Sequence, residues 1–354
     1  MSGETDIPPI EGNTSGTVMP SSTVSRIITP SAPDHTSAPD QYAFEQNRRL
    51  GRGVNLGNAL EAPNEGDWGV TLDASFFQLI ASAGFDSVRI PVRWNTHASL
   101  DPPYTIDPDF FDRVDWAIAQ AFKNDLNVII NIHHYEELME TPDLHYDRFL
   151  ALWEQIAFHY RTYPESLYFE LLNEPHGALK PLIWNDYAAE AIQIIRKSNP
   201  NRTIIAGSGN WNSIEALESL MLPEEERNLI VTVHYYAPFQ FTHQGAEWVP
   251  GTEKFLGTRW EGNEREKKAI DSDFDVAFRW SQKYARPIFL GEFGAYSKAD
   301  LESRQRWTEY VARSAERYGF SWAYWEFCAG FGLYNRQTQR WVEPLLQALI
   351  PEQK

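Results

Sequence analysis

The sequence predicts a single (β/α)8 barrel, and two observations carry this prediction. From residue 50 onward, short apolar runs alternate with longer amphipathic segments, which is typical of parallel strands connected by helices. The expected strands are rich in Val, Ile, Leu and aromatic residues without strict alternation, as strands buried on both faces should be. A doubly wound open sheet is the competing fold, but its glycine fingerprint after the first strand is missing.

The expected elements follow one another in regular order. Residues 1–43 are rich in Ser, Thr and Pro without an apolar period and are expected to form a tail or linker, and the barrel domain is expected to span 44–354. The expected strands cover 52–58, 87–92, 127–134, 167–174, 203–208, 229–236, 287–293 and 321–327. Expected helices cover about 73–83, 145–162, 181–198, 213–221, 272–285 and 342–350.

Two further helices are predicted from their capping residues. One begins after Asp107, which acts as N-cap before a proline at the first helical position. The other is expected to open with a capping box from Ser297 to Asp300 and to end at Gly319.

The composition excludes several classes of function. With 49 acidic and 31 basic residues the net charge is −18, which argues against binding to nucleic acid. A single cysteine, Cys328, excludes an internal disulfide framework and a cysteine-rich metal site. No apolar run approaches the ~20 residues of a membrane helix. The first residues also show no charged-then-apolar signal peptide. If the protein is exported, its signal is expected to have been removed ahead of this sequence.

Polar residues gather at the carboxyl ends of the expected strands, which is the end of an α/β barrel where chemistry takes place. A buried charge without a partner costs several kcal/mol, so this density of polar groups is hard to explain as core. The residues, in chain order, are Asn58, Glu61, Arg89, Arg93, His133, His134, Asn173, Glu174, His234, Tyr236, Glu292, Trp325 and Glu326.

Glu174 and Glu292 end the fourth and seventh expected strands, which can face each other across the mouth of an eight-stranded barrel. Enzymes that cleave glycosidic bonds typically use two facing carboxyl groups, one as acid and one as nucleophile or base. Alternatively, each glutamate pairs with an arginine as a stabilising bridge, as Arg89 could do for one of them. His234 and Tyr236 are two residues apart and point to the same side, where Tyr236 could hold a carboxylate ionised; both could instead be core residues.

The remaining candidates allow more than one interpretation. Neighbouring strand residues diverge, so His133 and His134 are not expected to bind a metal together, and no metal site is expected. A Gly-x-Ser-x-Gly elbow is missing. Trp325 and Trp248 could stack on sugar rings or could simply pack, and Trp248 lies in a connection of ~35 residues, a length that is usually functional.

Together these motifs resemble glycoside hydrolase family 5, the cellulase-type retaining β-glycanases, over residues 50 to 350. The resemblance rests on residues 52–61 (RGVNLGNALE), 88–91 (VRIP), 131–134 (NIHH), 173–175 (NEP), 234–236 (HYY), 291–294 (GEFG) and 325–326 (WE). The loops look most like a branch whose members cleave both β-1,4-glucan and β-1,4-mannan. The resemblance implies a secreted enzyme that acts on such polysaccharides without a cofactor; a monomer is expected.

The resemblance also implies a role for each matched residue. Glu174 would be the general acid/base and Glu292 the nucleophile, while Asn173 would hold the 2-hydroxyl of the sugar at the cleavage site. Tyr236 and Arg89 would orient Glu292, and His234 would stay near Glu174. The ring of Trp325 would lie beneath the sugar at the cleavage site. The glycone side would be lined by Asn58, Glu61, His133, His134 and Trp248.

Two physical expectations and several rival functions accompany this assignment. Retention requires carboxylates ~5–5.5 Å apart, and the acid needs a raised pKa, which the nearby charge of Glu292 would support. Within the family, a strict mannanase, a licheninase or a xylanase stays open. A non-catalytic glycan-binding barrel and a metal-dependent hydrolase that uses His133 and His134 are the rivals of other classes.

Overall fold

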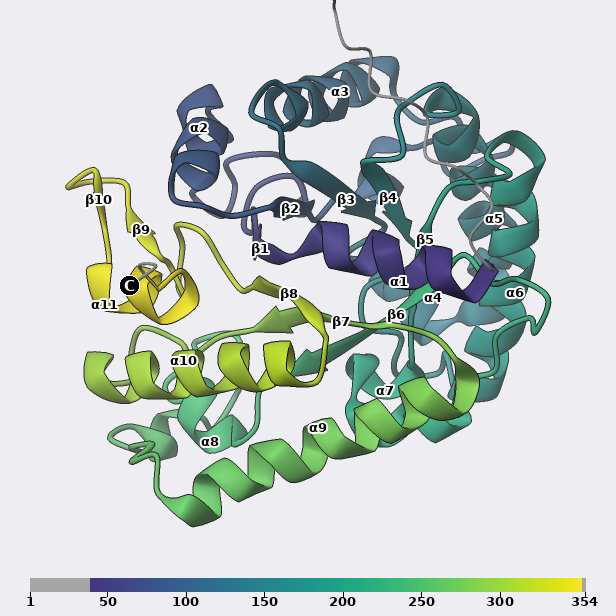
Figure 1. Ribbon diagram of the computed structural model, residues 1–354. Helices are drawn as coiled ribbons and strands as arrows, with labels where there is room; N and C mark the ends of the chain where they lie inside the picture. Colours follow the sequence, from purple (N-terminus) through teal and green to yellow (C-terminus); the bar gives the residue numbers. More distant parts are fainter. Residues whose placement is uncertain (1–38, 352–354) are drawn as a thin grey trace, which may run out of the picture. The chain divides into compact units, whose positions relative to one another are not determined.

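The computed structural model describes residues 39–351, and these residues confirm the predicted (β/α)8 barrel (Figure 1). The strands pair in parallel in the order β1 to β8, and β1 also pairs with β8, which closes the barrel. The predicted tail lies outside the described residues as far as residue 38. Helix α1 begins at Pro39, five residues before the expected start of the domain.

All eight predicted strands are present. They are β1 (Arg52–Asn55), β2 (Ser87–Ile90), β3 (Asn127–Asn131), β4 (Leu167–Glu170), β5 (Ile204–Gly207), β6 (Leu229–Tyr235), β7 (Ile288–Phe293) and β8 (Ser321–Tyr324). A separate antiparallel pair, β9 (Tyr334–Asn335) and β10 (Arg340–Trp341), follows the barrel.

The larger helices are α1 (Pro39–Leu50), α2 (Ala74–Ser82), α3 (Pro108–Lys123), α5 (Pro142–His159), α6 (Pro181–Ser198), α9 (Glu264–Tyr284), α10 (Leu301–Arg317) and α11 (Glu343–Leu349). Shorter helical turns are η1 (Trp94–His97), α4 (Glu136–Glu140), α7 (Gly209–Asn212), η2 (Ile214–Ser219), α8 (Phe239–Thr242) and η3 (Glu253–Phe255). The cap predicted at Asp107 is present, since its side chain accepts from the N–H of Asp109 at 3.0 Å.

Several predicted boundaries are wrong, and each has a local reason. The helix expected from 272 begins at Glu264, because Asn263 and Glu266 form a capping box eight residues earlier. The capping box expected at Ser297 does not form; Asp300 is the N-cap and accepts from the N–H of Ser303. The segment expected as a helix at 213–221 is the short 3₁₀ turn η2.

Helix α1 closes the amino-terminal end of the barrel, and it was not predicted (Figure 1). Asn47 donates to the carbonyl of Ile288 at 3.0 Å and accepts from the hydroxyl of Ser321 at 2.6 Å. The hydroxyl of Ser87 donates to the carbonyl of Leu50 at 2.7 Å. Since these partners begin strands β2, β7 and β8, the chain entering the barrel seals the end away from the strand termini.

The interior of the barrel has an apolar layer below a polar one. The apolar layer is a buried cluster of Leu50, Ile129, Tyr168, Ile205, Ile230, Phe289 and Ala323. Alternate strand residues share a face, so the next inward positions after Ile129 and Tyr168 are Asn131 and Glu170. The sequence therefore fills the closed end with hydrocarbon and places polar groups toward the carboxyl end.

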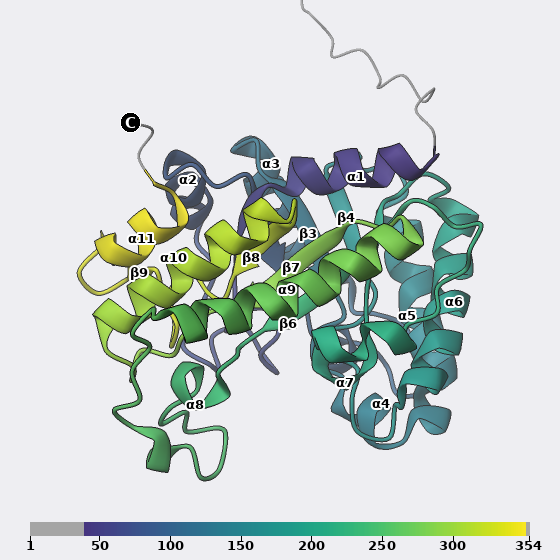
Figure 2. The ribbon, with the colours of Figure 1, turned by 60° about the horizontal axis from the view of Figure 1, so that its bottom comes forward.

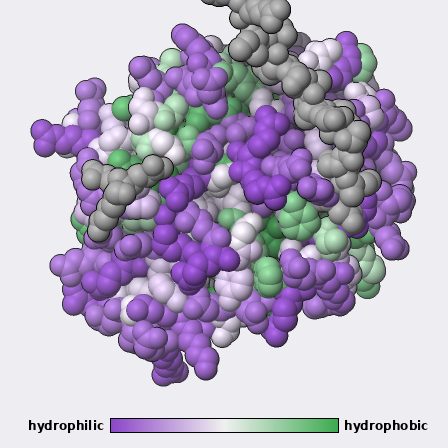
Figure 3. Space-filling model, viewed as in Figure 1, coloured by the Kyte–Doolittle hydropathy of each residue, from purple (hydrophilic) through white to green (hydrophobic). Residues whose placement is uncertain are grey.

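The carboxyl ends of the strands carry the long connections. In Figure 2, α4, α7 and α8 lie at the end of the barrel opposite α1. Figure 3 shows the face seen in Figure 1, where most of the visible residues are hydrophilic. Within residues 39–351, no helix has the length and apolar character needed to cross a membrane.

Candidate active site

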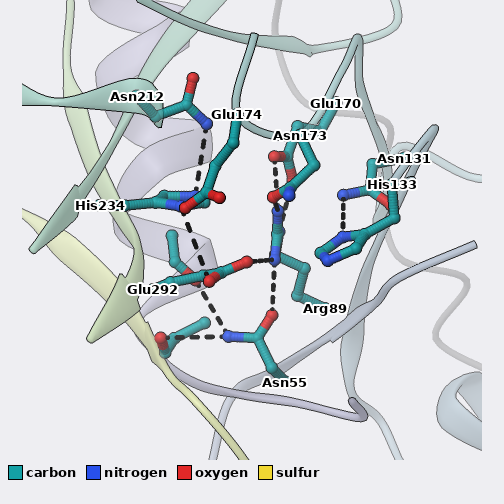
Figure 4. Close-up of polar contacts among 12 residues, drawn as sticks. Asn55, Arg89, Asn131, His133, Glu170, Asn173, Glu174, Asn212, His234 and Glu292 are labelled. Atoms are coloured by element: carbon teal, nitrogen blue, oxygen red, sulfur yellow. Dashed lines mark hydrogen bonds and ion pairs between the residues drawn. The ribbon is translucent and has the colours of Figure 1, made fainter. Parts of the chain in front are cut away.

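Two glutamates that the sequence separates by more than a hundred residues meet at one histidine (Figure 4). Glu174 follows β4 and Glu292 lies in β7. Nδ1 of His234 lies 2.7 Å from Oε1 of Glu174 and 3.6 Å from Oε2 of Glu292, and one such atom from each of the three residues lies within 4.8 Å of the others. A register shift between β6 and β7 sets His234 directly beside Glu292.

The buried guanidinium of Arg89 joins the two sides of the barrel. Its Nε and Nη2 donate to Glu170 at 2.5 and 2.7 Å, and its Nη1 donates to Oε1 of Glu292 at 2.7 Å. The remaining hydrogen bonds go to the amide oxygens of Asn55 and Asn173, both at 2.8 Å. Burial alone would disfavour the charge, but the two carboxylates raise the pKa of Arg89, so this cation is permanent and fully satisfied.

Glu292 is held at both oxygens. Arg89 donates to Oε1, and the hydroxyl of Tyr236 donates to Oε2 at 2.9 Å. Burial raises the pKa of Glu292, and the neighbouring His234 and Arg89 act against that rise. Burial and the charge of Glu292 raise the pKa of Tyr236 well above its ordinary value, so this phenol keeps its proton and remains a donor.

Glu174 has the properties of an acid near neutral pH. Burial raises the pKa of its carboxyl to about 7, against the opposing charge of Arg89. The rise was predicted with help from the charge of Glu292; its main cause is burial, and the charge of Glu170 adds to it. The backbone of Glu174 has a φ of 47°, a left-handed conformation that is uncommon for a residue with a side chain and is often found at active sites.

Asn212 determines which nitrogen of His234 carries the proton. The Asn212 amide satisfies its neighbours when its nitrogen donates to the Ser208 carbonyl at 2.9 Å and its oxygen accepts from the N–H of Glu174 at 3.3 Å. The oxygen then faces Nε2 of His234 at 3.4 Å and accepts a hydrogen bond from the Nε2–H group. Burial lowers the pKa of His234 to about 4, so the ring is neutral and Nδ1 has a lone pair. The short contact to Glu174 therefore requires the proton to lie on Glu174.

Both predicted histidines after β3 reach the mouth of the barrel. The strand ends at Asn131, so the divergence expected of neighbouring strand residues does not apply to them. The ring of His133 stacks on Trp325 with centroids 5.6 Å apart, and the ring of His134 meets His133 edge-on at 4.7 Å. Nδ1 of His133 lies 3.1 Å from the amide nitrogen of Asn131, which fixes the ring.

Glu61 and Asn58 form one turn after β1. The carboxylate of Glu61 accepts from the backbone N–H groups of Asn58 and Ala59, the second at 3.0 Å, and its side chain is only 1% exposed. Burial raises the pKa of Glu61 to about 8. A second buried carboxylate, Glu326, accepts from three N–H groups of the following loop, and burial raises its pKa to about 7. Glu61 thus shapes the loop, while Asn58 is half-buried.

Trp248 lies apart from the other predicted residues. Its ring is 56% exposed and packs on Tyr296, with centroids 4.8 Å apart, and on Phe331 at 6.0 Å. Its link to the candidate site runs through His243, whose ring lies 6.3 Å from that of Trp248 and 4.9 Å from that of Tyr236, centroid to centroid.

Sequence reasoning missed several residues of the site. Glu170 was visible as a charge inside an apolar strand, and its period of two from Tyr168 indicates the barrel interior. Trp211 and His176 gave no such signal. Their rings stack with centroids 4.9 Å apart, and Nδ1 of His176 donates to the carbonyl of Glu174 at 2.7 Å, so the half-exposed Trp211 stands beside the candidate acid.

Within residues 39–351, the Glu174, His234 and Glu292 group is the one set of three or more ligating side chains close enough to hold a metal ion. His133 and His134 are not part of it. Glu174 donates to Nδ1 of His234, and Glu292 accepts from Arg89 and Tyr236, so both carboxyl groups already have protein partners.

Comparison with known proteins identifies the family. The family model described as "Cellulase (glycosyl hydrolase family 5)" matches residues 51–330. The chain belongs to glycosyl hydrolase family 5. Endoglucanase H of Acetivibrio thermocellus is 36% identical over 330 residues, which are 90% of this chain but 35% of that protein. This family 5 chain thus spans about a third of that relative's length. Cellulase/esterase CelE from the same organism is 28% identical, and the chain covers 40% of it.

Solved structures support the same family at higher identity. Cel5A of Thermotoga maritima, solved with mannotriose and with cellobiose, is 56% identical and has a TM-score of 0.86. The match covers 87% of the family 5 chain described here and all of the mannotriose-bound chain. The cellulose synthase subunit Z of Clostridioides difficile is 43% identical, with a TM-score of 0.83 over 85% of this chain and 99% of that one.

Proposed function

We propose that this chain is a retaining, endo-acting β-1,4-glycanase with Glu174 as acid/base and Glu292 as nucleophile. The observation that carries the proposal is the meeting of both carboxylates at His234, with oxygens within 4.8 Å of each other. Retaining enzymes place their carboxyl groups ~5–5.5 Å apart, whereas inverting enzymes leave ~6.5–9.5 Å for a water molecule. The spacing favours retention.

In the first step, a carboxylate oxygen of Glu292 attacks the anomeric carbon as the glycosidic bond breaks, and Glu174 gives its proton to the departing sugar oxygen. A pKa of about 7 keeps Glu174 protonated at mildly acidic pH. Arg89 and Tyr236 aim Glu292 and leave it ionised. The products of this step are a covalent glycosyl-Glu292 ester and a free hydroxyl group on the leaving chain.

In the second step, water attacks the anomeric carbon, its proton goes to Glu174 and the bond to Glu292 breaks. Both glutamates return to their starting states. Asn173 is held by Arg89 beside this centre, where its amide can bind the 2-hydroxyl of the sugar. Trp325 and His133 supply a flat aromatic surface on the glycone side.

The proposed substrates are β-1,4-glucan, glucomannan and mannan. The support comes from relatives named endoglucanases and from Cel5A structures that hold cellobiose and mannotriose. Polymers of this kind lie outside cells, so we propose that the enzyme is secreted, and we expect it to act as a monomer. A strict mannanase, a licheninase and a xylanase are separated by rates on galactomannan, barley β-glucan and xylan measured beside glucomannan.

The deciding experiment replaces Glu292 by Ala. We expect no turnover of carboxymethyl cellulose or glucomannan, an unchanged circular dichroism spectrum and partial rescue by azide, which can occupy the space of the lost carboxylate. Full activity in the variant would overturn the mechanism. A wild-type protein that binds glucomannan without releasing reducing sugar would instead be a glycan-binding barrel, and loss of activity with a chelator would indicate a metal-dependent hydrolase.

A further inference from the structure

Thr242, the last residue of the short helix α8, contacts the chain just after β6 and just after β7. Its hydroxyl donates to the carbonyl oxygen of Tyr236 at 2.6 Å, directly beyond the end of β6. Its own carbonyl oxygen accepts from the N–H of Tyr296 at 2.8 Å, shortly after the end of β7. One residue therefore ties together the ends of the two strands that bring Tyr236 and Glu292 to the site.

This tie bears on the hydrogen bond between Tyr236 and Glu292. The phenol of Tyr236 donates to Oε2 of Glu292 at 2.9 Å. A hydrogen bond weakens steeply when its distance and angle depart from their preferred values. The β6–β7 ladder ends with the pair Tyr235 and Phe293, so Tyr236 lies one residue beyond it. There the hydroxyl of Thr242 supplies a partner for the carbonyl group of Tyr236.

The same hydroxyl also holds a ring that packs against the phenol. Oγ1 of Thr242 lies 3.0 Å from Nδ1 of His243. Since the single hydroxyl proton goes to the Tyr236 carbonyl, the histidine nitrogen is the donor in this second bond. The ring of His243 meets that of Tyr236 edge-on, with centroids 4.9 Å apart, and stacks on Phe239 at 4.3 Å. Thr242 thus acts on Tyr236 both at its backbone and through the neighbouring ring.

We infer that Thr242 is a positioning residue: it sets the hydrogen bond from Tyr236 to Glu292 and, through it, the orientation of the nucleophile. The inference rests on the proposed function for the role of Glu292. Because Thr242 is 0% exposed, it does not reach a substrate and acts through Tyr236. A buried threonine that donates to a carbonyl group is common and by itself indicates only a satisfied core residue. Thr242 differs because its partners lie at the ends of both strands of the site.

The test replaces Thr242 by Val, which keeps the shape but lacks the hydroxyl, and by Ser, which keeps the hydroxyl. The matched control is Thr308→Val in α10, because Thr308 is also 0% exposed and its hydroxyl has no hydrogen-bond partner within residues 39–351. For Thr242→Val we expect kcat on an aryl β-cellobioside to fall roughly three- to tenfold with KM little changed, since part of one hydrogen bond to a charged group is lost. Thr242→Ser should recover most of kcat, and Thr308→Val should match the wild type.

Combined variants separate positioning from a general loss of structure. In a Tyr236→Phe background the phenol hydroxyl is absent, so adding Thr242→Val should leave kcat within about twofold of the single Tyr236→Phe variant. Thr242→Ala takes the place of Thr242→Val in each comparison if the latter does not fold. An equal fall of kcat in both backgrounds, or wild-type kcat in Thr242→Val, would overturn the inference and leave the catalytic proposal intact.

A crystal structure of each variant gives a readout that does not depend on activity. In Thr242→Val the hydroxyl of Tyr236 should lie farther from Oε2 of Glu292 than the present 2.9 Å, and in Thr242→Ser it should stay in place. An unchanged contact in Thr242→Val would contradict the inference. A wild-type chain without activity on β-1,4-glycans would overturn the proposed function, and this distance would still decide whether Thr242 positions Tyr236.

Discussion

Replacing Glu170 by Gln removes one negative charge from the centre of the site while keeping the shape of the side chain. Glu170 does not touch the candidate substrate position; it acts through Arg89, which it holds with hydrogen bonds of 2.5 and 2.7 Å. Its charge raises the pKa of Glu174, and Arg89 lowers it. With Gln, the raising influence of Glu170 disappears, while burial still raises the pKa of Glu174 and Arg89 still lowers it, so this pKa falls from about 7.

The size of the effect follows from the burial of these groups. A unit charge at roughly 10 Å in an effective dielectric of about 20 contributes about 1.7 kcal/mol, which moves a pKa by roughly one unit. Breaking a buried ion pair costs about 3–5 kcal/mol, and Gln retains one acceptor for Arg89, so we expect about 3 kcal/mol of lost stability. Because the acid must be protonated, activity should then be lost at a pH roughly one unit lower than in the wild type.

The assay is kcat/KM against pH on an aryl β-cellobioside, together with thermal unfolding. A matched control is Glu226→Gln, whose carboxylate accepts from Nε of Arg196 at the same 2.5 Å but lies away from the mouth. The control should lose stability without any movement of the basic limb. If Glu170→Gln lowers kcat while the basic limb stays near pH 7, or if the control moves it equally, the electrostatic reasoning is refuted.

Three further predictions follow from neighbouring contacts. Tyr236→Phe removes the donor to Oε2 of Glu292, and since hydrogen bonds to charged groups contribute about 1.5–3 kcal/mol, kcat should fall roughly 10- to 100-fold with little change in the melting temperature. Asn212→Gly, which suits the φ of 54° there, frees His234 to donate from Nδ1, and the basic limb of the pH profile should move down by about one pH unit. Ile129→Ala empties part of the buried interior cluster and should cost about 2–5 kcal/mol in chemical denaturation, with kcat/KM preserved at low temperature.

The barrel was predictable because the strands are mostly apolar and polar residues lie at or just after the ends of most of them, a pattern that depends only on local sequence. The positions of Glu174 and Glu292 followed from the same pattern. Helix α1 was not predictable from its surroundings, because Ser-, Thr- and Pro-rich residues lead into it and its partners, such as Ile288 and Ser321, lie far along the chain. Long-range contacts of this kind leave no periodic signal.

The fine structure of the site was also out of reach of the sequence. The pairing of His234 with Glu292 depends on a register shift between β6 and β7, which no residue pattern announces. Asn212 reaches His234 from a turn in which three consecutive residues have positive φ, directly before the segment predicted as a helix from 213 onward. The cause of the raised pKa of Glu174 is burial by its three-dimensional neighbours, so only the direction could be anticipated.

The most direct test of the account is to trap the covalent intermediate. A 2-deoxy-2-fluoro cellobioside with a good leaving group forms the ester rapidly and hydrolyses slowly, so peptide mapping by mass spectrometry can locate the sugar. The account predicts one glycosyl group per chain, attached to Glu292, and none on Glu174. Inactivation with the label on any other residue, or turnover with no covalent species and an inverted product, would contradict it.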